Sequence, residues 1–340
     1  MFSFIPTDVF LLAFGLILLI KGGDWFVDAA SSIAKRFKLP ELLIGATVVS
    51  IGTTLPEVMT SAMGAMADNG AMAYGNAIGS IICNTALISA ITIAVKPGKA
   101  DKKSLIFPVC CFFGVAAFYA LNAYVAKTFA LWMGIVLIAA FVVYMVVNVL
   151  NMKKNPAEEE QEDKAVELDC ELPEENSKLG LIKEIGMLVV SALVIAVGAY
   201  LLVESATNIA VMLNVPQTVI SLTIVALGTS LPELVTAITA LSKGHGALSL
   251  GNIIGANIFN LVLVSGVAIT IRPFDVPAEA TFLGQNASLI FDLPLVFIVM
   301  GILTIPAVLK GKLYRWQGIS LLALYTAYLV LQVAIIPNFA

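Results

Sequence analysis

Two stretches of the sequence repeat each other inside apolar segments long enough to cross a membrane, and this duplication constrains the fold more than any other feature. GTTLPEVMTSA (Gly52–Ala62) returns as GTSLPELVTAI (Gly228–Ile238), 176 positions later. At the same offset, GNAIGSIICNTALIS (Gly75–Ser89) matches GNIIGANIFNLVLVS (Gly251–Ser265). The identities fall on Gly, Pro, Asn, Thr and Glu, whereas drift in an apolar chain would favour Leu and Val. We therefore expect two copies of one structural unit.

Apolar segments of spanning length occur ten times along the 340 residues, with about 20 residues needed for one helical span. They cover residues 8–30, 40–64, 71–95, 104–122, 128–150, 182–206, 216–241, 247–271, 287–309 and 316–337. The chain is 59% hydrophobic and 12% charged, whereas soluble domains are about 25% charged. The segments are too long for strands of a membrane β-barrel and do not alternate in polarity. The sequence predicts an all-α polytopic membrane protein with ten transmembrane helices.

One hydrophilic stretch divides these segments into two halves of five. Residues 1–150 form the expected first five-helix repeat and residues 181–340 the second, and together they make one transmembrane domain. Residues 151–180 hold ten acidic residues and four lysines, which is typical of a solvated linker. Because five is odd, the second copy enters the membrane inverted. Inverted-topology repeats with interrupted helices at matching places are typical of secondary transporters, and the interruptions indicate the binding site.

Lysine and arginine predict the orientation. If the N-terminus is outside, the inside loops carry sixteen of these residues and the outside loops only two, Lys127 and Arg272. This bias predicts a cytoplasmic linker and both termini outside. The first segment has no basic region before it and no small-residue cleavage site, so we expect a retained span and not a signal peptide.

Each copy of the first motif places a proline at membrane depth. Pro56 and Pro232 have no N–H, so the carbonyls of Gly52 and Gly228 lose their helical partners. Free carbonyls inside a membrane are tolerated only where protein, water or an ion satisfies them. We therefore expect an interrupted helix in each copy, with backbone oxygens available to a ligand.

A glutamate follows each proline. A carboxylate near the bilayer centre costs about 2.5–3.5 kcal/mol on insertion scales, so packing alone does not explain Glu57 and Glu233. Thr53 and Thr229 stand four residues earlier, on the same helical face as each glutamate. Oxygen ligands without histidine or thiolate suit Ca²⁺, Na⁺ or similar ions. The two motifs predict one cation site to which both halves contribute.

The second motif carries a polar stripe at four-residue spacing, with a G-x-x-x-G spacing that lets another helix approach closely. Its members are Asn76, Ser80 and Asn84 in the first copy and Asn252, Ala256 and Asn260 in the second. We expect Asn84 and Asn260 to contact the ion or its glutamates. Hydrogen bonding between helices explains Asn76 and Asn252 equally well.

Other residues with distinctive chemistry are few. The four cysteines have no C-x-x-C or metal spacing and are expected to be free thiols, and His245, the only histidine, is expected to be solvated. Asp24, Asp28 and Glu204 lie near span ends, where snorkelling explains them. No Gly-Lys-Ser phosphate loop is present. We therefore expect no cofactor, no nucleic-acid partner and no use of ATP.

These motifs resemble the two alpha repeats of the calcium/cation antiporter superfamily, specifically the prokaryotic sodium/calcium exchangers. The resemblance covers GTTLPE…GNAIGSIICN, GTSLPE…GNIIGANIFN and the ten-span layout. It implies two inverted five-helix halves around four central sites and exchange of three Na⁺ for one Ca²⁺ by alternating access. It also implies a prokaryotic inner (plasma) membrane location and a gate formed by sliding of the first and sixth helices.

The resemblance further implies residue roles. Glu57 and Glu233 would bind Ca²⁺, helped by Thr53 and Thr229. The flanking Na⁺ sites would use the positions of Ser50, Thr54, Ser80, Ala226 and Ser230, and Asn84 and Asn260 would join these sites or the central one. Two positions depart from the family. Ala256 stands where serine is frequent, which weakens one Na⁺ site, and Asn260 stands where potassium-dependent relatives carry aspartate, so no K⁺ dependence is expected.

Alternatives remain open at the sequence level. The same glutamates could carry H⁺ in a proton-coupled exchanger of Ca²⁺ or another divalent cation, and the sodium dependence of Ca²⁺ flux separates the two. A membrane hydrolase would need a nucleophile with a base, and the sequence shows no Ser/His or metal set. A passive cation channel would show a Ca²⁺ leak that ignores Na⁺. Ten spans around one site suffice in a monomer.

Overall fold

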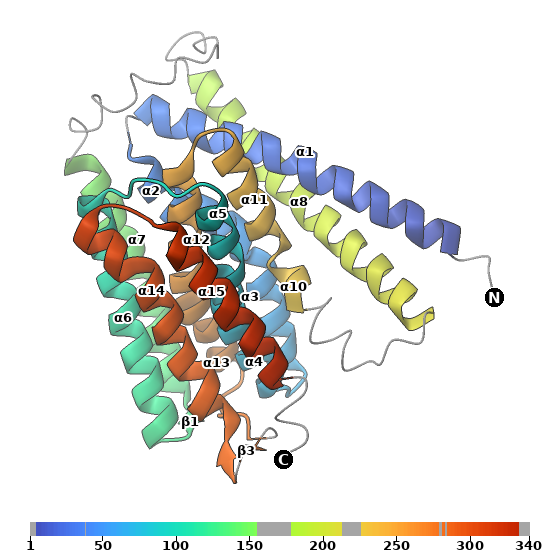
Figure 1. Ribbon diagram of the computed structural model, residues 1–340, viewed down its shortest axis with the longest axis vertical. Helices are drawn as coiled ribbons and strands as arrows, with labels where there is room; N and C mark the ends of the chain where they lie inside the picture. The colour runs from blue at the N-terminus through green and yellow to red at the C-terminus, as the bar shows by residue number, and fades with distance from the viewer. Residues whose placement is uncertain are drawn as a thin grey trace.

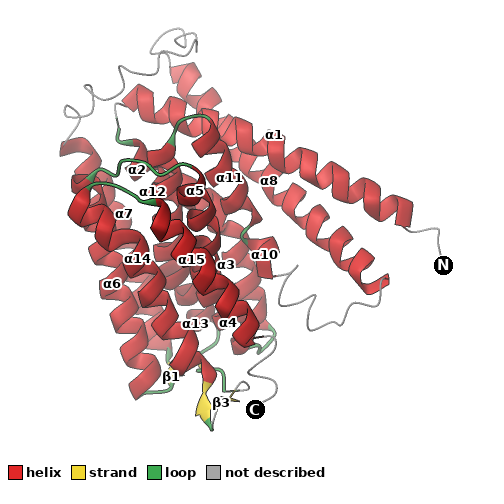
Figure 2. Ribbon diagram, in the orientation of Figure 1, coloured by secondary structure: helices red, strands yellow, loops and turns green. Residues whose placement is uncertain are grey.

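The computed structural model describes residues 5–37, 39–154, 178–212, 226–278, 281–282 and 284–332, and nearly all of them are helical (Figures 1 and 2). The α-helices are α1 (Ile5–Phe37), α2 (Glu41–Ile44), α3 (Ser50–Met66), α4 (Gly70–Cys83), α5 (Ala90–Val95), α6 (Lys102–Val125), α7 (Leu131–Lys154), α8 (Lys178–Met212), α10 (Ala226–Thr229), α11 (Leu231–Ser242), α12 (Gly246–Phe259), α13 (Ser265–Ile271), α14 (Leu293–Lys310) and α15 (Arg315–Val330). Four π-helical turns join some of these: η1 (Gly45–Val49), η2 (Asn84–Ser89), η5 (Asn260–Val264) and η6 (Ser288–Asp292). The strands are β1 (Thr128–Phe129), β2 (Phe274–Asp275), β3 (Thr281–Phe282) and β4 (Gln285–Asn286).

Eight helical stretches of the described chain are long and apolar enough to cross a membrane. They correspond to the first six predicted spans, the eighth and the ninth. The predicted spans 216–241 and 316–337 lie partly outside the described residues, and their described parts are helical except at Ser230. The all-α class of a polytopic membrane protein is thus confirmed, and the count of ten stays a prediction.

Successive long helices run in opposite directions, so their connections gather at two ends of the bundle (Figure 1). At one end, the segment before α6 pairs with the segment before α15: the Ala100 N–H donates to the Gly311 carbonyl at 3.0 Å, and the Leu313 N–H donates to the Gly98 carbonyl at 2.8 Å. At the opposite end, β1 pairs with β2 in antiparallel register.

Basic residues concentrate at the first of these ends, which we call the basic end. Its loops and helix ends carry Lys96, Lys99, Lys102, Lys103, Lys243, Lys310, Lys312 and Arg315. In the described connections at the opposite end, the basic residues are Lys127 and Arg272, and Arg272 pairs with Asp68. The predicted linker 151–180 falls largely outside the described residues; α7 continues to Lys154 and α8 begins at Lys178.

Helices α1 and α8 lie side by side and lean away from the other helices (Figure 1). Glycines allow their backbones to approach closely. A Cβ on Gly15 would stand 2.8 Å from the Gly198 carbonyl oxygen, and one on Gly198 would stand 2.9 Å from the Gly15 carbonyl oxygen. Close contact through small residues holds helices together where lipid removes the usual hydrophobic driving force.

Helix α12 lies at the centre of the bundle. It contacts α2, η1, α3 and α11, and its residues from Leu248 to Phe259 are all buried. A helix that is apolar on every side is suited to this position. The second repeat motif therefore runs through the middle of the protein, where its few polar side chains face other helices and not lipid.

Candidate ion-binding site

The two glutamates of the repeat motifs lie on α3 and α11, which contact each other in the bundle. Glu57 and Glu233 both have a relative exposure of 0%. The Thr54 hydroxyl of α3 lies 3.5 Å from Oε1 of Glu233 and donates to it. Residues far apart in sequence thus meet in one buried region, as the duplicated motif predicts.

The local backbone differs between the two copies. In the second, α10 ends at Thr229, Ser230 has non-helical angles (φ −89°, ψ 6°) and Pro232 lies in the first turn of α11. This agrees with the predicted interruption. In the first copy, α3 stays helical through Pro56, so the prediction of a second interruption is wrong. A proline removes one backbone hydrogen bond, and here the helix on both sides is long enough to continue past it.

Asn84 and Asn260 each begin a π-helical turn, η2 and η5 respectively, at equivalent places in the two copies. Such turns change the direction in which side chains point and are frequent at functional sites. The turn η2 contacts α11, and η5 contacts α3. Each asparagine turn therefore packs against the glutamate-bearing helix of the other half.

Buried polar atoms without a hydrogen-bond partner concentrate in this region. In the described part of the chain there are fourteen such side-chain atoms. Eight of them belong to five residues of the two repeats: Glu57, Glu233, Ser230, Asn84 and Asn260. Buried polar groups in proteins are normally paired. A set left unpaired together indicates that these side chains serve a ligand.

The charges at this place support a cation as that ligand. Neither glutamate forms an ion pair with a described lysine, arginine or histidine. An ionised carboxylate buried without a partner costs several kcal/mol or more, so two of them favour a positively charged occupant. Among the described residues, no three His, Cys, Asp or Glu side chains come together as a metal cluster. The donors are two carboxylates with neutral oxygens, which suits hard cations such as Ca²⁺ and Na⁺.

The predicted hydroxyl ligands differ in their contacts. Ser50 and Thr53 are buried. The Thr53 hydroxyl donates to the side-chain oxygen Oδ1 of Asn252 at 3.2 Å, and the Ser50 hydroxyl lies 2.7 Å from the Gly45 carbonyl and 2.9 Å from the backbone carbonyl of Asn252. Ser230 is buried with its hydroxyl unpaired, and Ser80 is 3% exposed.

Thr229 is half-buried at the end of α10, where it lines an apolar groove between α3 and α8. The side chain of Ala226 lies outside the described residues. The structure thus brings Ser50, Thr53, Thr54 and Ser230 toward the glutamates or Asn252, and it shows no such contact for Thr229.

The two asparagines for which the sequence left both roles open bond between helices. The Asn76 amide donates to the Glu57 carbonyl at 3.0 Å and to the Ser61 hydroxyl at 2.8 Å. The Asn252 amide donates to the Thr236 hydroxyl at 3.0 Å. Both side chains hold the glutamate-bearing helices in place, because Glu57 and Thr236 lie on α3 and α11.

The glycine spacing is confirmed in the second copy only. Gly251 and Gly255 face α2 and η1, and a Cβ on Gly251 would overlap the Leu42 carbonyl. A Cβ on Gly75 or Gly79 would meet no described atom within 4 Å. Their partners by the repeat would be residues 218–226, whose backbone up to 225 lies outside the described residues, so this pair stays a prediction.

One neighbour of the glutamates was missed from the sequence. The Cys83 thiol lies beside Ser230 and Tyr325 and close to both glutamates. The Asn257 amide donates to the Thr85 hydroxyl at 2.7 Å. The repeat could not indicate Cys83, because its equivalent is Phe259.

Several polar residues connect helices at the basic end, among them His245, which was expected to be solvated. His245 Nδ1 lies 2.6 Å from Oε1 of Glu41. The Lys243 ammonium lies 2.8 Å from Asp28 and 3.5 Å from Asp24, so it ties the turn after α11 to α1.

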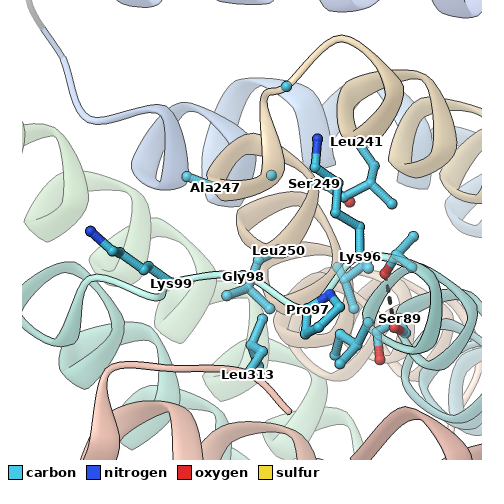
Figure 3. A pocket seen from close by; sticks show the side chains of 15 residues that line it. Ser89, Lys96, Pro97, Gly98, Lys99, Leu241, Ala247, Ser249, Leu250 and Leu313 are labelled. Atoms are coloured by element: carbon cyan, nitrogen blue, oxygen red, sulfur yellow. Dashed lines mark hydrogen bonds between the residues drawn. The ribbon is translucent and has the colours of Figure 1, made fainter. Parts of the chain in front are cut away.

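A pocket of about 240 Å³ opens at the same end (Figure 3). It is lined by the segment after α5, with Lys96 and Pro97, and by residues of the turn before α12 and its first turns, with Gly246 and Ser249. Neither glutamate lines it. The pocket is therefore separate from the region of the two glutamates, although Ser89 at its wall closes the π-turn that Asn84 begins.

Comparison with known proteins agrees with this architecture. A sequence profile of the family described as sodium/calcium exchanger protein matches residues 7–150 and 183–334. The sodium/calcium exchanger MaX1 of Methanosarcina acetivorans is 32% identical over 356 aligned positions, which cover 96% of this chain and 98% of that protein. The putative antiporter CaxA of Alkalimonas amylolytica is 32% identical, with coverage of 95% and 97%.

Among solved structures, one of the sodium-calcium exchanger NCX_Mj matches with a TM-score of 0.79 at 30% identity, covering 96% of this chain and 99% of that one. The match in sequence and the match in structure each cover nearly the whole length of the chain. The chain is a transporter and not an enzyme, and it belongs to the sodium/calcium exchanger family, with prokaryotic exchangers among its relatives.

Proposed function

We propose that this protein exchanges Na⁺ for Ca²⁺ across a membrane, through one central site built from Glu57 and Glu233. The observation that carries the proposal is the pair of fully buried carboxylates, three of whose four oxygens have no hydrogen-bond partner in the described chain, together with the unpaired side-chain atoms of Ser230, Asn84 and Asn260. Relatives of similar length are described as sodium/calcium exchangers.

The charge of the site matches its substrates. Two carboxylates neutralise one Ca²⁺, and several Na⁺ in its place bring at least the same charge. In this proposal Glu57 and Glu233 hold Ca²⁺ with oxygens at Thr53 and Thr229. Na⁺ occupies flanking positions, for which the candidates are Ser50, Thr54, Ser80, Asn84, Ala226, Ser230 and Asn260. Exchange of three Na⁺ for one Ca²⁺ would move one net charge, worth about 2.3 kcal/mol per 100 mV.

The arrangement of helices suggests how access alternates. In the proposed topology, ten helices form two inverted five-helix repeats, residues 1–150 and 181–340, joined by a cytoplasmic linker at 151–180. Helices α1 and α8, the openers of the two halves, lean away from the rest as a pair. We infer that this pair slides against the remaining helices and exposes the site to one side at a time.

The distribution of basic residues supports an orientation. The basic end faces the cytoplasm under the positive-inside rule, so both termini face outward across a prokaryotic inner (plasma) membrane. One chain contains both glutamates, so a monomer is sufficient for transport.

The test is Ca²⁺ uptake into proteoliposomes preloaded with Na⁺, compared with vesicles preloaded with choline. Uptake that needs internal Na⁺ supports the exchanger. Uptake that ignores Na⁺ and follows an imposed pH gradient would replace it by proton-coupled exchange of Ca²⁺ or another divalent cation. A Ca²⁺ leak that responds to neither gradient would indicate a channel.

A further inference from the structure

A further buried carboxylate, that of Asp292, lies away from the central site, on η6 at the beginning of α14. Asp292 is 8% exposed. Its Oδ1 accepts hydrogen bonds from the Tyr328 hydroxyl at 3.2 Å and from the Gln332 amide at 3.0 Å, at the end of α15. Ser288, one turn earlier, lies beside the same carboxylate. An ionisable group inside a membrane helix bundle indicates a functional site.

No basic residue is among the groups that act on Asp292 in the described chain. The sequence has no lysine or arginine from 273 to 309 or from 316 to 340. The groups that act on Asp292 in the described chain are the neutral side chains of Ser288, Tyr328 and Gln332. Neutral donors orient a carboxylate and reduce the cost of burying it, but they leave its charge in place.

One unpaired hydroxyl group, that of Tyr74, lies beside Asp292, and a second, that of Tyr119, lies near Tyr74. Tyr74 on α4 is 3% exposed, and its hydroxyl has no hydrogen-bond partner in the described chain, although it lies next to Ser288 and Asp292. Tyr119 on α6 is fully buried, and its hydroxyl is also unpaired. The Phe129 ring packs against the rings of Tyr74 and Tyr119, with centroid distances of 6.2 Å and 4.8 Å, and forms an apolar surface beside them.

We infer that Asp292, with the hydroxyl groups of Ser288 and Tyr74, forms a binding site for one monovalent cation, separate from the glutamate site. One carboxylate with neutral oxygens balances a single positive charge, whereas a divalent ion would keep one uncompensated charge in apolar surroundings. All the available ligand atoms are oxygens, which suits Na⁺. The purely structural alternative is that Asp292 only joins α14 to α15.

The experiment counts radioactive Na⁺ bound to purified protein in lipid nanodiscs, with ionic strength held constant by choline. Four proteins are compared: the wild type, Asp292→Asn, Glu57→Gln/Glu233→Gln, and the triple variant. Asn keeps an acceptor for Tyr328 and Gln332 and removes the charge, so the link between α14 and α15 survives. Asp275→Asn is the matched control, because Asp275 is an exposed carboxylate at the same end.

The site predicts that Asp292→Asn binds one Na⁺ fewer per chain than the wild type, and that the triple variant binds one fewer than the double glutamine variant. Asp275→Asn is expected to bind as the wild type does. Equal Na⁺ counts with and without Asp292 in both backgrounds would overturn the inference and leave Asp292 as a structural residue. Tyr74→Phe removes one hydroxyl without touching the carboxylate, and its expected weaker Na⁺ binding checks the result if Asp292→Asn folds poorly.

Discussion

Replacing Glu57 by Gln keeps the volume of the side chain and removes one of the two negative charges of the central site. Leaving a buried charge without its partner costs about 3–5 kcal/mol, and every 1.4 kcal/mol changes an affinity tenfold. Ca²⁺ affinity is therefore expected to fall by at least about a hundred-fold. Both carboxylate oxygens of Glu57 are unpaired, whereas Oε1 of Glu233 accepts from Thr54. Glu57→Gln should thus cost at least as much as Glu233→Gln.

The same geometry limits the effect of the hydroxyl group. The Thr54 contact is long, at 3.5 Å, so Thr54→Val loses one weak hydrogen bond, about 0.5–1.5 kcal/mol or up to roughly tenfold in affinity. Titration calorimetry of Ca²⁺ into purified protein in Na⁺-free buffer measures all three variants. Glu204→Gln, at an exposed glutamate of α8, controls for loss of a membrane carboxylate elsewhere. Wild-type affinity in both glutamine variants, or a larger loss for Thr54→Val than for Glu57→Gln, would refute the reasoning.

Three further substitutions test other parts of the structure. Gly251→Ala inserts a Cβ against the Leu42 carbonyl and should lower the free energy of unfolding by about 1–3 kcal/mol. A thermal melt of the detergent-solubilised protein measures this, and Gly114→Ala is the control, because its Cβ would meet no atom within 4 Å. Asn252→Ala removes the side-chain acceptor of the Thr53 hydroxyl and the amide that donates to Thr236 and should cost about 1–3 kcal/mol, so an unchanged melting temperature would contradict the assigned hydrogen bonds. Asn260→Asp adds a third carboxylate to the site and should make Ca²⁺ uptake respond to K⁺, which flux with and without K⁺ measures; indifference to K⁺ would argue against a place for Asn260 among the ion ligands.

The duplicated motif by itself predicts the region of the proposed site. Glu57 and Glu233 can be paired because they sit at the same place in two copies, and an unpaired carboxylate at membrane depth has a large energetic cost. Their burial and their lack of partners agree with that expectation. Asn84 and Asn260 follow from the four-residue stripe.

Other features leave no readable pattern in the sequence. The π-helical turns at Asn84 and Asn260 differ from α-helix by one hydrogen-bond step, and no local residue preference marks that difference. The continuity of α3 through Pro56 depends on the length of helix on both sides. Asp292 escaped notice because its equivalent in the first half is Ala116, so the repeat gives no signal there.

The lengths of α1 and α8 have a consequence for the bilayer around the protein. They contain 33 and 35 residues, about 50 Å each at 1.5 Å per residue, whereas the hydrocarbon core measures about 30 Å. Such helices meet the membrane by tilting, and the tilt changes with its thickness. The acyl-chain length of the lipid therefore affects the tilt of α1 and α8, the pair of helices that leans away from the bundle. Because the proposed transport cycle moves this pair, the thickness of the host membrane influences that cycle.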